Sequence, residues 1–271
     1  MTRRVIVALM VLSLIPASAF AQAGSAVPRG PDGKPDFTGV WQGGSTLRGS
    51  WDDANSGFGV GGSGKNPDAP PVVGSNERPA GREGAPYQDW AAKKVVESFN
   101  KRAIDDPTAL CLPPGVPRSV MLGLFPQKIV QTPKEIVVLY EYMNTFRTIP
   151  LNAKHPDDVN ASYMGDSVGH WEGDTLVVDV IGFNDKTWLA GTGTFHSEAL
   201  HITERYTRVD RDRINYEVTM VDPKVFTKPW TLTSSLMLRE GTRVQEYVCA
   251  ENNLDPANFE KLLKAGAQIS R

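Results

Sequence analysis

The pentapeptide Gly165-Asp166-Ser167-Val168-Gly169 has the pattern G-x-S-x-G, with which many serine hydrolases present a nucleophilic serine. That arrangement needs a strand before the serine and a helix after it. Here the preceding "HPDDVNASYM" is turn-like, and the following "VGHWEGDTLVVDVIGF" predicts a strand, a turn and a second strand. We therefore interpret the two glycines as shaping a turn in which Asp166 and Ser167 bind local backbone donors. A nucleophilic Ser167 is the alternative, because catalytic triads occur on unrelated folds.

A second group of chemically capable residues lies in "GTGTFHSEALHITERYTRVD", with one more carboxylate in the preceding loop "GFNDKTWL". A histidine beside a carboxylate is the usual equipment for acid–base catalysis near neutral pH. Two histidines and a glutamate could also hold a divalent metal. The spacing H-x-E-x-x-x-x-H lacks the helical pair of H-E-x-x-H, however, and we predict no metal site. The candidate catalytic residues are His196, Glu198, His201, Arg205 and Asp185.

The strand predicted from Leu200 onward divides this group between two faces. Alternation places His201 and Arg205 on one face and Glu204 and Tyr206 on the other. If the first face points into a barrel, a histidine and an arginine in line would fix a polar ligand head or stabilise an oxyanion. The alternative is a salt-bridged strand surface with histidines at its rim.

Aromatic residues are the candidates for contact with an apolar ligand. A histidine beside a tryptophan could line a pocket for a ring-shaped molecule, and the alternative is that such residues are core. His155, in "KHPDD", is expected to be an exposed turn residue. The residues selected as ligand contacts are His170, Trp171, Trp188, Tyr206 and Trp230. Further aromatic residues that could line a cavity are Trp41, Tyr140, Tyr142, Phe146, Tyr216 and Tyr247.

The elements that must position these residues are mostly short strands. Segments rich in β-branched and aromatic residues alternate with explicit turns, as in "EIVVLYEYM", "DTLVVDVIGF", "RINYEVTMVD" and "TRVQEYVCA". We predict an all-β, mostly antiparallel fold: an up-and-down barrel of about eight strands with one N-terminal helix. The tripeptide Gly39-Val40-Trp41 is similar to that of lipocalin-type barrels. A β-sandwich is the alternative.

The chain is organised as one domain behind an export signal. We expect a signal peptide at 1–21, a flexible lead-in at 22–34 and a single β-barrel domain at 35–271. Within the domain, 43–86 is rich in Gly and Pro and has no periodicity that could bury a face. Apolar residues at helical spacing predict a helix at 87–103.

The N-terminal residues and the two cysteines indicate the cellular compartment of the protein. Two arginines, a short apolar run and the triplet Ala19-Phe20-Ala21 predict cleavage after Ala21 and a periplasmic or secreted protein. In an oxidising compartment, Cys111 and Cys249 are expected to form a disulfide, with two buried thiols as the alternative.

Charge and hydropathy exclude several partners. With 29 basic and 31 acidic residues, the net charge of −2 gives no electrostatic footprint for nucleic acid. No apolar run reaches the roughly 20 residues of a membrane-spanning helix, so we predict no membrane insertion. No motif in the chain indicates a cofactor, and nothing in it indicates the oligomeric state.

Several segments together resemble a family of uncharacterised exported bacterial proteins. They include "PDFTGVWQ", "CLPPGVPR", "MGDSVGHWEGDTLVVDVIGFNDKTWL", "HSEALHITERYTRVD" and "EYVCAENN". The resemblance implies export and no particular activity. Three functions remain: a barrel that binds a small apolar or aromatic molecule; an enzyme on the same barrel, either a hydrolase or a lyase or isomerase; and an envelope structural or interaction protein that uses 43–86.

Overall fold

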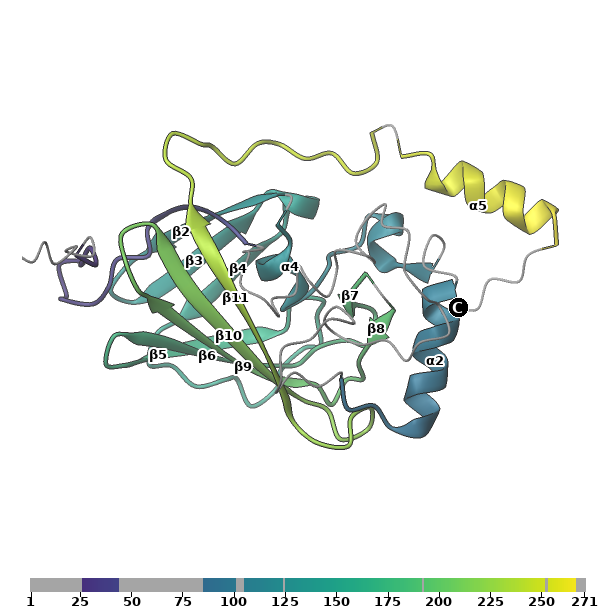
Figure 1. Ribbon diagram of the computed structural model, residues 1–271, viewed down its shortest axis with the longest axis horizontal. Coiled ribbons are helices and arrows are strands. Elements are labelled where there is room, and N and C mark those ends of the chain that lie inside the picture. Colours follow the sequence, from purple (N-terminus) through teal and green to yellow (C-terminus); the bar gives the residue numbers. More distant parts are fainter. Residues whose placement is uncertain are drawn as a thin grey trace, which may run out of the picture.

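The dominant feature of the computed structural model is a nine-stranded sheet that curls into a nearly closed barrel (Figure 1). The structure describes residues 26–43, 85–100, 105–123, 125–191, 193–251 and 253–266. The predicted signal peptide and nearly all of the Gly/Pro-rich segment lie outside these residues. In sheet order the strands are β4 (Phe146–Pro150), β3 (Glu135–Tyr140), β2 (Pro126–Gln131), β1 (Gly39–Gln42), β11 (Trp230–Leu238), β10 (Arg213–Val221), β9 (His201–Arg208), β6 (Thr175–Ile181) and β5 (Asp166–Glu172). The predicted all-β, antiparallel barrel is confirmed.

The barrel closes at two places. The first strand β1 pairs antiparallel with the last strand β11, with Trp41 opposite Leu238. Between β4 and β5 a parallel bridge joins Leu151 to Gly169, and the N–H of Asn152 donates to the carbonyl of Gly169 over 2.7 Å. A Cβ atom on Gly169 would lie 2.9 Å from Cγ2 of Ile149. The second glycine of the G-x-S-x-G pattern therefore allows this close approach.

Alternation along the strands gives the barrel an apolar interior and a polar outer face. On β9 and β10 the buried residues occupy every second position, so that Ile202 and Tyr206 point inward, as do Ile214 and Val218. One end is packed by Trp41, whose Nε1 donates to the carbonyl of Phe37 over 2.8 Å. Burying these large apolar side chains is the main source of stability.

Helices and a small hairpin cover the other end. Helix α2 (Asp89–Asn100) lies beside the hairpin β7 (Trp188–Ala190) and β8 (Thr194–Phe195), to the right of the barrel in Figure 1. The remaining elements are the helices α4 (Arg118–Met121) and α5 (Asp255–Lys264) and the 3-10 turns η1 (Pro107–Leu110) and η2 (Tyr142–Asn144). None of the helices within the described ranges is long and apolar enough to cross a membrane.

The predicted last strand, "TRVQEYVCA", is wrong. These residues run along the surface without sheet pairing, because β1 already occupies the edge of β11. The N–H of Tyr247 donates to Oδ1 of Asn144 over 3.2 Å, and its ring lies 5.2 Å from that of Phe125. A disulfide between Cys111 and Cys249 ties the segment to the residues after η1.

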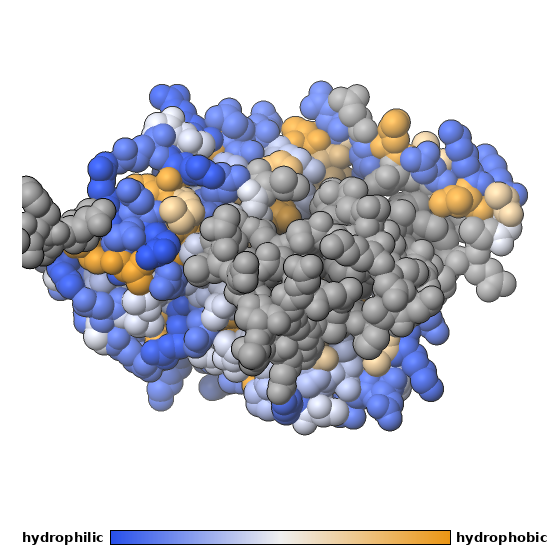
Figure 2. Space-filling view, viewed as in Figure 1, coloured by the Kyte–Doolittle hydropathy of each residue, from blue (hydrophilic) through white to orange (hydrophobic). Residues whose placement is uncertain are grey.

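The expectation of a flexible lead-in at 22–34 does not hold for its described part. Residues 26–34, expected as a flexible lead-in, form a turn in which the Arg29 guanidinium donates twice to the Asp174 carboxylate, at 2.9 and 2.6 Å. The described part of the face in Figure 2 is mostly hydrophilic, with apolar patches that include the region of α5. Leu254 and Leu262 are among the exposed apolar residues there.

Candidate functional site

A cluster of ionised and hydroxyl side chains lies in the middle of the barrel. The guanidinium of Arg147 on β4 pairs with the carboxylate of Glu204 on β9, and the two side chains are 1% and 0% exposed. Oε1 of Glu204 also accepts hydrogen bonds from Oη of Tyr206 and of Tyr216, each at 2.8 Å. Nε of Arg147 donates to Oγ of Ser167 over 2.8 Å. We call these five residues the interior cluster.

Because the interior cluster is buried, the pKa values of its tyrosines and its arginine are shifted. Removal from water, together with the nearby Glu204 carboxylate, raises the pKa of Tyr206 and of Tyr216 well above the ordinary value. Burial alone would lower the pKa of Arg147, but the attraction of Glu204 outweighs it and holds that pKa well above its usual range. The tyrosines therefore stay neutral donors and the arginine stays charged at any physiological pH.

Two hydroxyl groups next to the cluster are buried without a hydrogen bond to any described residue. They are Oη of Tyr140, on β3, and Oγ of Ser234, on β11. Their residues are 4% and 1% exposed, and both occupy inward positions of their strands. Burial raises the pKa of Tyr140 to about 12, opposed by the charge of Arg147 and by an interaction of the hydroxyl with its guanidinium, which does not reach hydrogen-bond geometry. Ser234 is the cross-strand neighbour of Tyr216. Leaving such a group unpaired costs about 1–3 kcal/mol.

Ser167 belongs to this cluster and is not in a turn. It lies on β5 with its side chain buried, and its hydrogen-bond partner is the Arg147 guanidinium. A guanidinium donates only and cannot accept a proton from a nucleophile. The preceding Gly165 has φ +70°, and a Cβ there would lie 2.8 Å from Cγ1 of Val180. The expected turn with backbone contacts is therefore wrong, and the pattern serves strand packing and barrel closure.

His196, the first predicted catalytic residue, is buried outside the barrel strands. Its Nε2 lies 2.6 Å from Oγ1 of Thr187, and its Nδ1 lies 2.9 Å from the carbonyl oxygen of Ser197. The carbonyl can only accept, so Nδ1 carries the proton and Nε2 accepts from the threonine. Burial lowers the pKa of His196, and nearby carboxylates, among them Asp185, oppose the shift only partly.

The remaining predicted catalytic residues are not hydrogen-bonded to His196 and lie on the surface. Glu198 pairs with Lys224, and Asp185 is exposed in the loop after β6. His201 and Arg205 share one face of β9, as predicted, but that face is the outer one. The inward face carries Glu204 instead, so the proposal that His201 and Arg205 face a ligand inside the barrel is wrong.

On the outer face, His201 joins a chain of alternating histidines and carboxylates. Nε2 of His201 lies 2.6 Å from Oδ1 of Asp179, whose Oδ2 lies 3.0 Å from Nε2 of His155. Nδ1 of His155 lies 2.5 Å from Oδ1 of Asp166. We call these four residues the outer network. His155 is 16% exposed and has two partners, so the expectation of an exposed turn residue is wrong.

Some of the residues predicted as ligand contacts are buried inside the barrel, and the others lie on its outer face or in the hairpin that covers one end. Tyr206 and Trp230 are buried at inward positions, and the ring of Trp171 packs 5.4 Å from that of Phe37 at one end. Nε1 of Trp171 and Nε1 of Trp230 are both buried without a partner among the described residues. His170, by contrast, lies outside, with Nε2 3.3 Å from Oε1 of Glu172. Trp188 belongs to the hairpin that covers one end.

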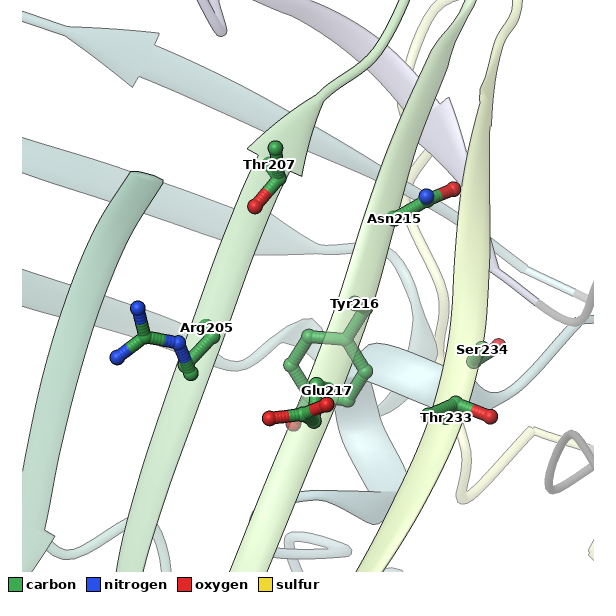
Figure 3. Close-up of a pocket in the computed structure, with 7 residues that line it drawn as sticks. All are labelled: Arg205, Thr207, Asn215, Tyr216, Glu217, Thr233 and Ser234. Atoms are coloured by element: carbon green, nitrogen blue, oxygen red, sulfur yellow. The ribbon is translucent and has the colours of Figure 1, made fainter. Parts of the chain in front are cut away.

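A shallow hollow of about 410 Å³ opens on the outer face of β9, β10 and β11 (Figure 3). The residues that line it are Arg205, Thr207, Asn215, Tyr216, Glu217, Thr233 and Ser234. Tyr216 and Ser234 border it from strand positions whose side chains point into the barrel. The part of the chain that the structure describes contains no group of three or more His, Cys, Asp or Glu arranged to hold a metal ion.

Sequence reasoning missed Arg147, Glu204 and Ser234 as site residues, and it named Tyr140 as one of several aromatic residues that could line a cavity. A signal for Glu204 was present, because it stands in phase with Ile202 and Tyr206 on the apolar face of β9. Comparison of the chain with models of known protein families, with curated proteins and with solved structures yields no match. The function is therefore argued from this geometry.

Proposed function

We propose that this protein is an exported barrel whose interior binds a small, largely apolar or aromatic molecule that carries one or two polar groups. The observation that carries the proposal is the pair of buried, unpartnered hydroxyls of Tyr140 and Ser234 beside the interior cluster. Buried polar groups in folded proteins normally have partners. A ligand that hydrogen-bonds to both hydroxyls would supply the missing ones.

The surroundings of these hydroxyls favour an apolar ligand body. Other inward positions of the barrel carry Ile149 and Val178 as well as the rings of Tyr206 and Tyr216, and all four are buried. Arg147 and Glu204 already neutralise each other, so this pair offers no free charge to an ionic ligand. Sites of this kind are mostly apolar, with a few placed polar groups that fix orientation.

The interior cluster would act as the rigid base of the site. Glu204 accepts bonds from three side chains on three strands, β4, β9 and β10, and so fixes the tyrosine rings that a ligand would contact. A buried ion pair adds little net stability, because the cost of desolvation offsets the attraction. We infer that it is present to hold this geometry.

The export part of the proposal rests on the N-terminal sequence and on the disulfide. The segment before Ala21 has the charge and apolar pattern of a signal peptide. The bond between Cys111 and Cys249 fits an oxidising compartment such as the periplasm.

Native mass spectrometry of the mature protein tests the proposal. The protein is exported to a bacterial periplasm, purified without detergent and measured before and after denaturation. We expect an excess organic mass that disappears on denaturation, and extraction into solvent would identify its chemical class. A chain that carries no excess mass, or a metal ion alone, would overturn the proposal.

A further inference from the structure

The outer hollow of Figure 3 has a lining that differs in chemistry from the barrel interior. Side chains from three neighbouring strands form it, in two rows that cross the sheet. Arg205, Glu217 and Thr233 are direct cross-strand neighbours in one row, and Thr207 and Asn215 in the next. Neighbouring strands lie about 4.8 Å apart, so each row presents polar groups at regular short intervals.

The one positive charge of the lining is already paired. Nη2 of Arg205 donates to Oε2 of Glu172 over 2.8 Å. Figure 3 shows the guanidinium on the side of β9 away from β10, so it does not turn toward Glu217. An anionic ligand would therefore meet an arginine that is already paired. A cationic ligand would find Glu217 alone, with Arg205 on the next strand.

The other lining groups are available for hydrogen bonding. Within the described residues, the side chains of Asn215, Glu217 and Thr233 form no hydrogen bond or ion pair, and all three are exposed. Together they offer an amide, a carboxylate and a hydroxyl, which include both donors and acceptors. Among the residues that line the hollow, Tyr216 is the one aromatic residue, and it borders the hollow from a strand position whose side chain points into the barrel.

Such a lining matches a neutral, polyhydroxylated molecule. Each hydroxyl of a sugar both donates and accepts, as a threonine hydroxyl does, and so can pair with a carboxylate, an amide or a hydroxyl in turn. The volume of about 410 Å³ is within the range of small-ligand sites, about 300–1,000 Å³. The base is rigid, because β9, β10 and β11 pair without interruption along the rows.

We propose that this outer hollow is a second binding site, specific for a neutral saccharide. Glu217 and Asn215 provide the central contacts, and Thr233 and Thr207 provide contacts at the two sides. The site is separate from the barrel interior, since the side chains of Tyr216 and Ser234 fill the opposite face of the same strands.

Binding of the mature protein to an array of neutral and anionic oligosaccharides, followed by saturation-transfer NMR with the best binder, tests this site. We expect binding to neutral members that weakens about tenfold or more in Glu217→Ala and in Asn215→Ala, as the loss of hydrogen bonds to a carboxylate or an amide predicts. Glu135→Ala is the matched control, because Glu135 is an exposed glutamate on β3, away from the hollow.

Several outcomes would overturn the proposal. They are no binding to any saccharide, preference for anionic members, or equal weakening in Glu217→Ala and Glu135→Ala. Thermal unfolding of each variant shows whether it is folded, and Glu217→Gln, which keeps the shape of the side chain, serves if Glu217→Ala is not. Tyr140→Phe should bind saccharide as the unaltered protein does, so that failure of the interior site and failure of the outer site are distinguishable.

Discussion

The interior cluster and the outer network use similar chemistry in opposite environments. Each sets cationic or hydrogen-bonding nitrogen groups against carboxylates at hydrogen-bond distance. Inside the barrel, Arg147 and Glu204 are 1% and 0% exposed, whereas the side chain of His201 in the outer network is 48% exposed. Water screens the outer contacts and leaves the inner ones at full strength.

Because of this difference in exposure, the histidines on the outer face are held by weak contacts, whereas the residues of the interior cluster are held by strong ones. Three of the four histidines of the chain, His155, His170 and His201, lie on the outer face, each within hydrogen-bond distance of a carboxylate. Solvent can replace such contacts at little cost. Arg147 and Glu204 have no such substitute, because each would be left as an unpaired buried charge.

The largest expected effect follows from breaking the inner pair. Glu204→Gln leaves the Arg147 guanidinium buried without its counter-charge, and we expect a loss of about 3–5 kcal/mol in the free energy of unfolding, measured in urea. Adding Arg147→Met to that variant removes the unpaired charge and should restore much of the loss. Glu172→Gln, which breaks the exposed pair with Arg205, is the matched control and should change little. Equal losses for the inner and outer glutamates would contradict the comparison.

A second expected effect separates the partnered tyrosine from the unpartnered one. Tyr216→Phe removes a donor to the Glu204 carboxylate and should cost about 1.5–3 kcal/mol. Tyr140→Phe removes a hydroxyl that has no partner within the described residues, and it should leave the stability of the ligand-free protein unchanged or raised. Urea unfolding of the two variants, each first freed of bound ligand, checks this, and a similar loss in both would show that another group of the protein satisfies Tyr140.

A third prediction concerns the buried histidine, His196, and the pH dependence of stability. The folded-state pKa of His196 is lowered, so the unfolded chain binds its proton at a higher pH than the folded chain does. Its contribution to stability is therefore complete above about pH 6.5, the ordinary histidine value, and is lost as the pH falls toward and through the lowered pKa. One proton accounts for at most about 1.4 kcal/mol per pH unit. Unfolding measured between pH 7 and 4.5 should show a shallower decline in His196→Gln, and parallel curves would contradict the prediction.

A smaller effect is expected at the serine of the hydrolase-like pattern. Ser167→Ala removes the acceptor of Nε of Arg147 and should cost about 1 kcal/mol in urea unfolding. Hydrolysis of p-nitrophenyl acetate should be the same in the variant and in the unaltered protein, because the neighbour of Ser167 cannot act as a base. Loss of esterase activity in Ser167→Ala alone would restore the nucleophile interpretation.

The smallest effect is expected in the outer network. His201→Gln replaces an exposed ring whose partner, Asp179, also contacts His155. The change in unfolding free energy should stay within about 0.5 kcal/mol, as for most surface substitutions. A loss as large as that of Glu204→Gln would mean that the outer network, and not the interior cluster, is the constrained region.

The local rules of the sequence predict much of this fold. Alternation identifies the strands and their two faces, and the turn residues separate them, as in Glu172-Gly173-Asp174 between β5 and β6. The same alternation puts Glu204 in phase with its apolar neighbours. It does not say which face is inward, because both faces of β9 carry charged residues. The sequence therefore left open whether Arg205 points into the barrel or belongs to a salt-bridged outer surface, and the structure shows the second.

The candidate site depends on contacts between residues far apart in the sequence. Arg147 meets Glu204 only because β4 and β9 face each other across a closed barrel, and no local pattern encodes that distance. In the same way, His155 acquires its two carboxylates from β5 and β6 although it lies in a loop. The C-terminal segment shows the opposite error, since "TRVQEYVCA" has the composition of a strand but no free edge to pair with.

Ligand retention in two matched tyrosine variants tests the central claim most directly. Native mass spectrometry of Tyr140→Phe and Tyr142→Phe compares the same chemical change inside the barrel and in the aromatic group with Phe125 outside it. We predict that Tyr140→Phe loses most of the non-covalently bound mass although its ligand-free form is as stable as the ligand-free unaltered protein, while Tyr142→Phe retains the bound mass. Equal retention by both variants and the unaltered protein would contradict the assignment of the barrel interior as the binding site.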